Sequence, residues 1–109
     1  MQAITPSVVD ARSLALHREV ARRLRDRPEL LEVARARVRG WREDEDIHPH
    51  WIEAWSDLLS RPLDEIIEVI TDPGEHGAEL RQASPFAGVL DPRTRWEILR
   101  SHTDHGSPP

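Results

Sequence analysis

The sequence contains no cysteine and no tyrosine, and no long apolar run interrupts its polar composition. Without cysteine there are no disulfides, no thiolate metal sites and no cysteine nucleophile. Residues 1–9 lack the basic start and apolar stretch of a signal peptide, and no apolar run approaches the roughly 20 residues that cross a bilayer. We therefore expect a cytoplasmic protein without a membrane association.

Lysine is also absent, so all 15 basic side chains are arginines. Residues 1–42 hold ten arginines against five acidic residues, whereas residues 43–109 hold five arginines against fifteen acidic residues. The first part is therefore positive and the second negative, and the formal net charge of the chain is −5. A GC-rich coding sequence explains the lack of lysine, but guanidinium groups also bind carboxylates and phosphates bidentately.

Apolar residues recur at helical spacings of three and four, and no segment alternates with a period of two. This pattern predicts an all-α fold without a sheet. The length of 109 residues suits one domain with one core. We expect a compact bundle of five to six short helices over residues 10–100, a flexible N-terminus over residues 1–9 and a disordered tail over residues 101–109.

Prolines that follow short turn residues mark most of the expected helix starts, because the missing N–H of proline costs nothing in the first turn. A capping-box spacing between Ser7 and Asp10 opens the first helix. The expected helices lie over residues 10–26 and 28–42, after Pro49, from Pro62 to a stop at 72–74, over 75–82, and after Asp91-Pro92. The helix after Pro49 has the clearest apolar stripe and should form the centre of the core, with Trp51, Ile52, Trp55, Leu58 and Leu59.

No catalytic motif frames any serine, because both the GxSxG elbow and the SxxK pair are missing, and no glycine-rich phosphate loop is present. His48, His50 and Glu53 are the one set that resembles a metal site, which a metal-dependent enzyme would use. Helix capping explains the His-Pro-His segment equally well. We predict that the protein is not an enzyme and has no metal and no cofactor.

Arginines at helical spacing form a possible positive ridge on the first two helices. Its members are Arg18, Arg22 and Arg25, continued by Arg35, Arg39 and Arg42. A solvated face with internal ion pairs, an acidic protein surface and a nucleic-acid backbone are the three interpretations of such a ridge. Neighbouring glutamates favour the first.

The segment from Ser84 to Leu90 is unusually apolar for a connection between helices. It either packs its apolar groups on the core or offers them to another chain. The tryptophans pose the same choice, since tryptophan fills cores and is also enriched among the residues that dominate binding at interfaces.

The segment from Leu80 to Leu90 (LRQASPFAGVL), followed by Arg95-Trp96, and the segment from Ser13 to His17 (SLALH) carry a resemblance to known proteins. Over residues 12 to about 100 the chain resembles a group of small, uncharacterised, all-helical bacterial proteins. That family occurs alone or attached to a DNA-binding helix-turn-helix segment, an arrangement similar to the antitoxins of toxin–antitoxin pairs. The resemblance implies no catalytic residue.

Together these observations predict a non-enzymatic module that binds and restrains a protein partner, as an antitoxin or a regulatory subunit does. The partner would then be a toxin or another regulated protein, and homo-oligomerisation is left open. The residues predicted to contact the partner are Arg81, Phe86, Val89, Leu90 and Trp96. The alternative is a small DNA-binding transcriptional regulator, whose predicted contacts are Arg18, Arg22, Arg25 and Arg39.

Overall fold

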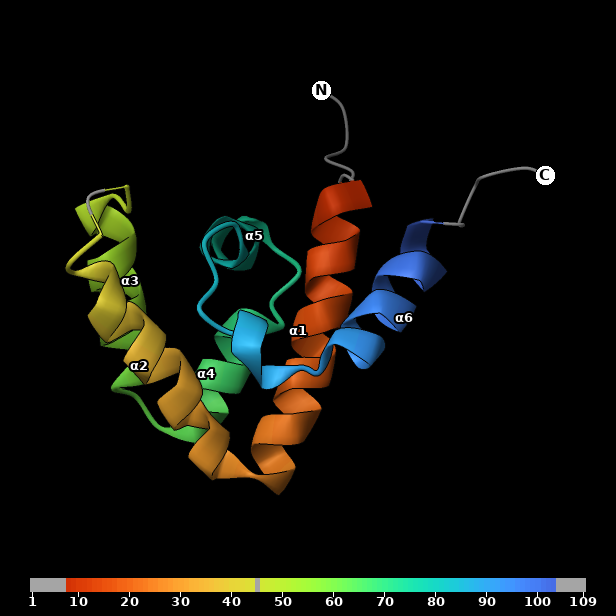
Figure 1. Cartoon of the computed structure of the whole chain (residues 1–109), viewed down its shortest axis with the longest axis horizontal. Helices are drawn as coiled ribbons and strands as arrows, with labels where there is room; N and C mark the ends of the chain where they lie inside the picture. Colours follow the sequence, from red (N-terminus) through yellow and green to blue (C-terminus); the bar gives the residue numbers. More distant parts are fainter. Residues whose placement is uncertain (1–7, 45, 104–109) are drawn as a thin grey trace.

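The chain folds into six α-helices and two short 3-10 helices in a computed structural model that describes residues 8–44 and 46–103 (Figure 1). The α-helices are α1 (Val8–Asp26), α2 (Leu31–Trp41), α3 (Pro49–Leu59), α4 (Leu63–Ile70), α5 (Glu75–Arg81) and α6 (Pro92–Thr103), and the 3-10 helices are η1 (Pro28–Leu30) and η2 (Ala87–Val89). Within the described ranges there is no strand. The predicted all-α bundle is thus confirmed.

Prolines open helices where expected, with local differences. Pro49 begins α3 and Pro92 begins α6, but Pro28 begins the 3-10 turn η1, so the α-helical part of the predicted second helix starts only at Leu31. Pro62 lies at the cap before α4. At α6 the expected cap is present, because the Asp91 carboxylate accepts a hydrogen bond of 3.1 Å from the Thr94 N–H.

The chain ends are more helical than the sequence predicts. Helix α1 begins at Val8, inside the segment expected to be flexible, and α6 continues to Thr103, past the expected domain end at residue 100. Helix ends are the least certain part of such predictions, because terminal turns are held by few interactions. Ser7, the predicted capping residue of the first helix, lies outside the described residues.

The apolar stripe of α3 lies at the centre of the core, as predicted. Trp55 has no exposed surface, and Ile52, Leu58 and Leu59 are buried beside it, while Trp51 is half-buried. Ile66 and Ile70 of α4 and Leu24 of α1 are also fully buried, so three helices meet here. Removing such side chains from water is the main source of stability for a domain of this kind.

The helices are arranged as two pairs with shorter elements between them. Figure 1 shows α6 alongside α1 and α2 beside α3, with α4, α5 and η2 in between. Arg23 of α1 fixes the start of α6, because its guanidinium lies 3.3 Å from the Asp91 carboxylate and donates to the Thr94 hydroxyl at 3.2 Å. None of the described helices is both long enough and apolar enough to cross a membrane.

Candidate functional site

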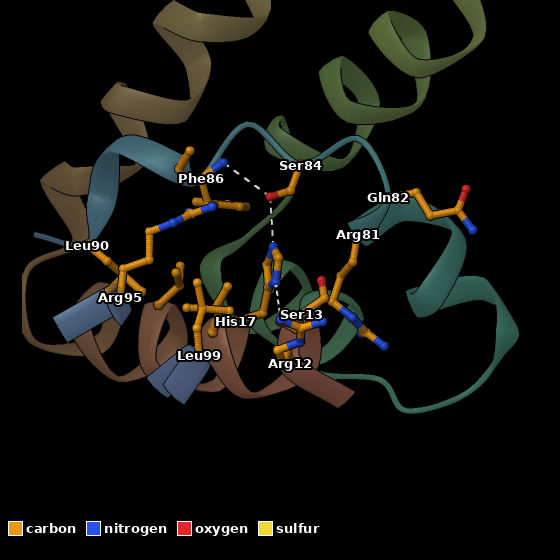
Figure 2. Close-up of a pocket in the computed structure, with 13 residues that line it drawn as sticks. Arg12, Ser13, His17, Arg81, Gln82, Ser84, Phe86, Leu90, Arg95 and Leu99 are labelled. Atoms are coloured by element: carbon orange, nitrogen blue, oxygen red, sulfur yellow. Dashed lines mark hydrogen bonds between the residues drawn. The ribbon is translucent and has the colours of Figure 1, made fainter. Parts of the chain in front are cut away.

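A cleft with a volume of about 450 Å³ lies between α1, the end of α5, the loop before η2 and α6 (Figure 2). Its apolar lining consists of Leu16, Val20, Phe86, Ala87, Leu90 and Leu99. Its polar lining consists of Arg12, Ser13, His17, Arg81, Gln82, Ser84 and Arg95. Three arginines therefore line the cleft, and none of the lining residues that the structure describes is acidic.

Helical spacing places these side chains on the cleft. Arg12, Leu16 and Val20 recur every four residues along α1, and Arg95 and Leu99 do so along α6. Residues four apart lie one above the other on the same face of a helix. Faces of both helices thus contribute to the wall of the cleft, and the loop that follows α5 completes it.

His17 and Ser84 join α1 to this loop through a chain of hydrogen bonds (Figure 2). His17 Nδ1 lies 2.7 Å from the Ser13 carbonyl oxygen, which can only accept, so Nδ1 carries the proton. Nε2 is then the acceptor for the Ser84 hydroxyl, also at 2.7 Å, and the Phe86 N–H donates to that hydroxyl oxygen at 3.2 Å. Both imidazole nitrogens of His17 and the Ser84 hydroxyl are therefore engaged in hydrogen bonds.

The pKa of His17 is lowered from 6.5 to about 4, and burial is the main cause. The hydrogen bond to the Ser13 carbonyl raises this pKa, and the nearby positive charges of Arg81 and Arg95 lower it. The imidazole is neutral at neutral pH. A base with so low a pKa accepts a proton poorly, so the Ser84 hydroxyl gains little nucleophilic character from it. The geometry supports a structural role for this pair.

Arg81 fixes the position of α5 against the end of α4. Its side chain is buried, and Nη1 donates to the carbonyl oxygens of Ile70 at 3.2 Å and Asp72 at 2.7 Å. Gly77 of α5 packs against the same place, because a Cβ there would lie 2.9 Å from Arg81 Nη1 and would collide with the Asp72 carbonyl oxygen. Glycine weakens a helix, and this close packing explains its presence at position 77.

Arg95 differs from the other arginines of α6 in its surroundings. Arg93 pairs with Glu97 at 3.5 Å, and the Arg100 guanidinium lies over the Trp96 ring, 5.1 Å from its centroid. The Arg95 guanidinium makes no ion pair or side-chain hydrogen bond with any residue of the described chain, and Figure 2 shows the side chain extending from α6 toward Phe86. A cation beside apolar groups without a counter-charge is suited to binding an anion.

The five residues predicted to contact a partner do not form one surface. Arg81, Phe86 and Leu90 line the cleft and are otherwise buried, and Phe86 packs edge-on against Trp55 at 5.7 Å between ring centroids. Val89 is buried and does not line the cleft. Trp96 alone is on the surface, with 58 % of its area exposed. The apolar loop thus packs mainly on the core, which is the first of the two interpretations of its composition.

The predicted arginine ridge is interrupted by internal contacts. Arg22 pairs with Glu19 at 3.0 Å and Arg39 pairs with Glu32 at 2.6 Å. Arg18 and Arg25 are exposed, with no ion pair to a described residue. On the second helix, Arg35 turns toward α3 and donates twice to the Leu59 carbonyl oxygen. The ridge is therefore not a continuous positive surface, and the DNA-binding alternative stays a prediction.

The His-Pro-His segment caps a helix. His48 precedes α3, and its Nδ1 accepts a hydrogen bond of 3.0 Å from the His50 N–H. Glu53 is exposed one turn further on. Among the side chains that the structure describes, no three histidine, cysteine or acidic residues are grouped in a way that could hold a metal ion.

Sequence reasoning missed Arg12, His17, Ser84 and Arg95 as members of one site. His17 falls on the apolar face of α1, which indicates burial, but Ser84 lies 67 residues further along the chain. Helical spacing relates only residues within one element. Only the packing of α6 and of the loop against α1 brings the four together.

Comparisons with known proteins yield no relative: no family model, no curated protein and no solved structure matches this chain. The resemblance to small bacterial antitoxin-like proteins stays a prediction.

Proposed function

We propose that this chain is a non-enzymatic module that binds and restrains a partner protein, and that the cleft receives an acidic group of that partner. The observation that supports it best is the position of Arg95, whose guanidinium makes no ion pair with a described residue and lies beside an apolar wall. The antitoxin-like character implied by the family resemblance agrees with such a role. No step of this proposal requires a cofactor.

The cleft combines charge with apolar surface in a way that suits a protein segment. Arg12 and Arg95 come from different helices, and Phe86, Leu90 and Leu99 lie among them. A carboxylate flanked by an apolar side chain complements both features, since guanidinium groups bind carboxylates through two parallel hydrogen bonds. A volume of about 450 Å³ is within the usual range for binding sites of small groups.

The hydrogen-bond chain through His17 supports binding in preference to catalysis. Both imidazole nitrogens are already engaged, one by the Ser13 carbonyl and one by the Ser84 hydroxyl. The low pKa of the imidazole makes it a weak base at neutral pH. These groups hold the wall of the cleft in place, which pre-organises a binding site.

The test is recovery of the partner from the native host with three forms of the tagged chain: wild type, Arg95→Gln and Arg93→Gln. Both substitutions remove one positive charge from α6, but Arg93 lies outside the cleft with 88 % of its side chain exposed. We expect one co-purifying protein with wild type and Arg93→Gln, and roughly tenfold or greater loss with Arg95→Gln, because a charge-assisted hydrogen bond is removed. Equal recovery of that protein with all three forms would contradict the proposal, provided that circular dichroism shows all three folded.

A further inference from the structure

We infer that the group recognised in the cleft is a carboxylate carried next to an apolar group, as in an acidic or C-terminal residue beside a leucine-like side chain. This inference rests on the proposed function and adds the chemistry of the ligand. Arg95 supplies the charge and the wall formed by Phe86, Leu90 and Leu99 supplies the apolar contact.

The positive charge comes from two sides of the cleft. Arg12 lies on α1 and is half-buried, whereas Arg95 lies on α6 and is exposed. Arg95 is therefore the more accessible of the two to a ligand from solvent. Arg81 adds a third positive charge, but its Nη1 is engaged by the carbonyl oxygens of Ile70 and Asp72. The donor available to a negative group is therefore the guanidinium of Arg95, which makes no ion pair with a described residue.

The electrostatics favour a singly charged group over a phosphate. Arg81 and Gln82 form one wall at the C-terminal end of α5, where helix carbonyl groups carry partial negative charge. Phosphate sites usually add several backbone N–H donors at a helix N-terminus or a glycine-rich loop. Among the described lining residues, the N–H of Phe86 is already used by the Ser84 hydroxyl. A planar carboxylate fits a guanidinium fork without such extra donors.

The apolar wall indicates that charge alone does not define the ligand. Phe86 and Leu90 are almost completely buried, and they present only the part of their surface that faces the cleft. A bare anion would leave that surface in contact with water. Each methylene group buried there should raise the affinity about fourfold.

The test is a titration of the full chain with four probes: N-acetyl-leucine, N-acetyl-leucinamide, acetate and inorganic phosphate. Binding is measured from the changes in backbone amide chemical shifts in NMR spectra. We expect N-acetyl-leucine to shift the amides of His17, Ser84 and Arg95 with a dissociation constant on the order of millimolar. The amide lacks the charge and acetate lacks the apolar group, so each should bind roughly tenfold more weakly or worse.

Three outcomes would overturn the inference. They are equal binding of N-acetyl-leucinamide, tighter binding of phosphate than of N-acetyl-leucine, and no shift of the cleft amides with any probe. Arg95→Gln should weaken N-acetyl-leucine binding roughly tenfold or more, and the matched variant Arg93→Gln should leave it unchanged. Equal weakening by both variants would also contradict it, because it would mean that general charge attracts the probe.

Two short peptides distinguish the sources of the carboxylate. One ends in a leucine with its C-terminal carboxylate, and the other carries an internal aspartate before leucine and ends in an amide. Binding of either supports the inference and identifies the source, whereas binding of neither contradicts it.

The two proposals can fail separately. If the cleft binds N-acetyl-leucine but the host yields no Arg95-dependent protein, the proposed function fails and the ligand chemistry stands. If an Arg95-dependent protein is recovered but no carboxylate probe shifts the cleft amides, the ligand chemistry fails and the proposed function stands.

Discussion

His17 Nε2 accepts a hydrogen bond from the Ser84 hydroxyl at 2.7 Å, and this contact connects the first helix to a loop 67 residues later in the chain. The same imidazole packs edge-on against Phe86, with 6.1 Å between ring centroids. Phe86 in turn packs against Trp55 at the centre of the core. The polar wall of the cleft and the apolar core are therefore one connected structure, so changes in either should affect both.

The burial of His17 makes stability depend on pH. In the unfolded chain the imidazole has its ordinary pKa of 6.5, whereas in the folded protein burial lowers that pKa to about 4. Between these values the unfolded chain binds more protons, so the free energy of unfolding is constant above pH 6.5 and falls as the pH decreases toward 4. At about pH 5 we expect a loss of roughly 2 kcal/mol relative to neutral pH, measured by urea unfolding.

The control for this prediction is His17→Gln, which keeps a polar side chain but removes the titrating group. His48, His50 and His76 are exposed, whereas His17 is buried. The variant should lose most of the pH dependence between about pH 7 and pH 5. The same slope in both proteins would show that other groups cause it.

Ser84→Ala removes both hydrogen bonds of the Ser84 hydroxyl. It leaves the Phe86 N–H without its acceptor and leaves His17 Nε2 without its donor. We expect a loss of about 1–3 kcal/mol in the free energy of unfolding, because buried polar groups lose their partners. Ser101→Ala is the comparison, since Ser101 is exposed on α6, and it should change stability by less than about 0.5 kcal/mol. Similar losses in both variants would refute a specific role for Ser84.

Two glycine-to-alanine variants should have opposite effects. At Gly77 an added Cβ would meet Arg81 Nη1 and the Asp72 side chain, both at 2.9 Å, as well as the Asp72 carbonyl oxygen. We expect Gly77→Ala to destabilise the protein by about 1–3 kcal/mol through overpacking. At Gly40, inside α2, an added Cβ meets nothing within 4 Å, so Gly40→Ala should raise stability by up to about 1 kcal/mol. Thermal melting of both variants measures the difference.

The sequence was sufficient to predict the helices because their signals are local. Prolines at Pro49 and Pro92 and the apolar stripe around Trp55 each act within one or two turns, and the structure confirms all three. The helix ends at Val8 and Thr103 were missed, since a helix end depends on weak competition between a few residues.

The cleft could not be predicted because it depends on contacts between distant elements. Arg95 reads in the sequence as one of several charged residues on α6. Helical spacing gives Arg93 a partner in Glu97, four residues away. Only the fold shows that Arg95 lines the cleft formed with α1 and the loop. In the same way, the apolar composition of the segment from Ser84 to Leu90 makes Phe86 unusual, but only the fold shows that Phe86 is 2 % exposed and lines a cleft.

Trp96 lies on the surface, whereas Trp55 lies in the core. Trp55 is fully buried, so Trp55→Ala should cost about 3–5 kcal/mol in the free energy of unfolding. Trp96 is 58 % exposed and contacts Arg100 over its ring, so Trp96→Ala should cost only about 0.5–1 kcal/mol.

Because Trp96→Ala keeps the protein folded, it also tests Trp96 as a partner contact. If the interface extends beyond the cleft over α6, Trp96→Ala should lower the recovery of the Arg95-dependent partner. Unchanged recovery would mean that the interface is confined to the cleft. It would contradict the prediction that Trp96 contacts the partner.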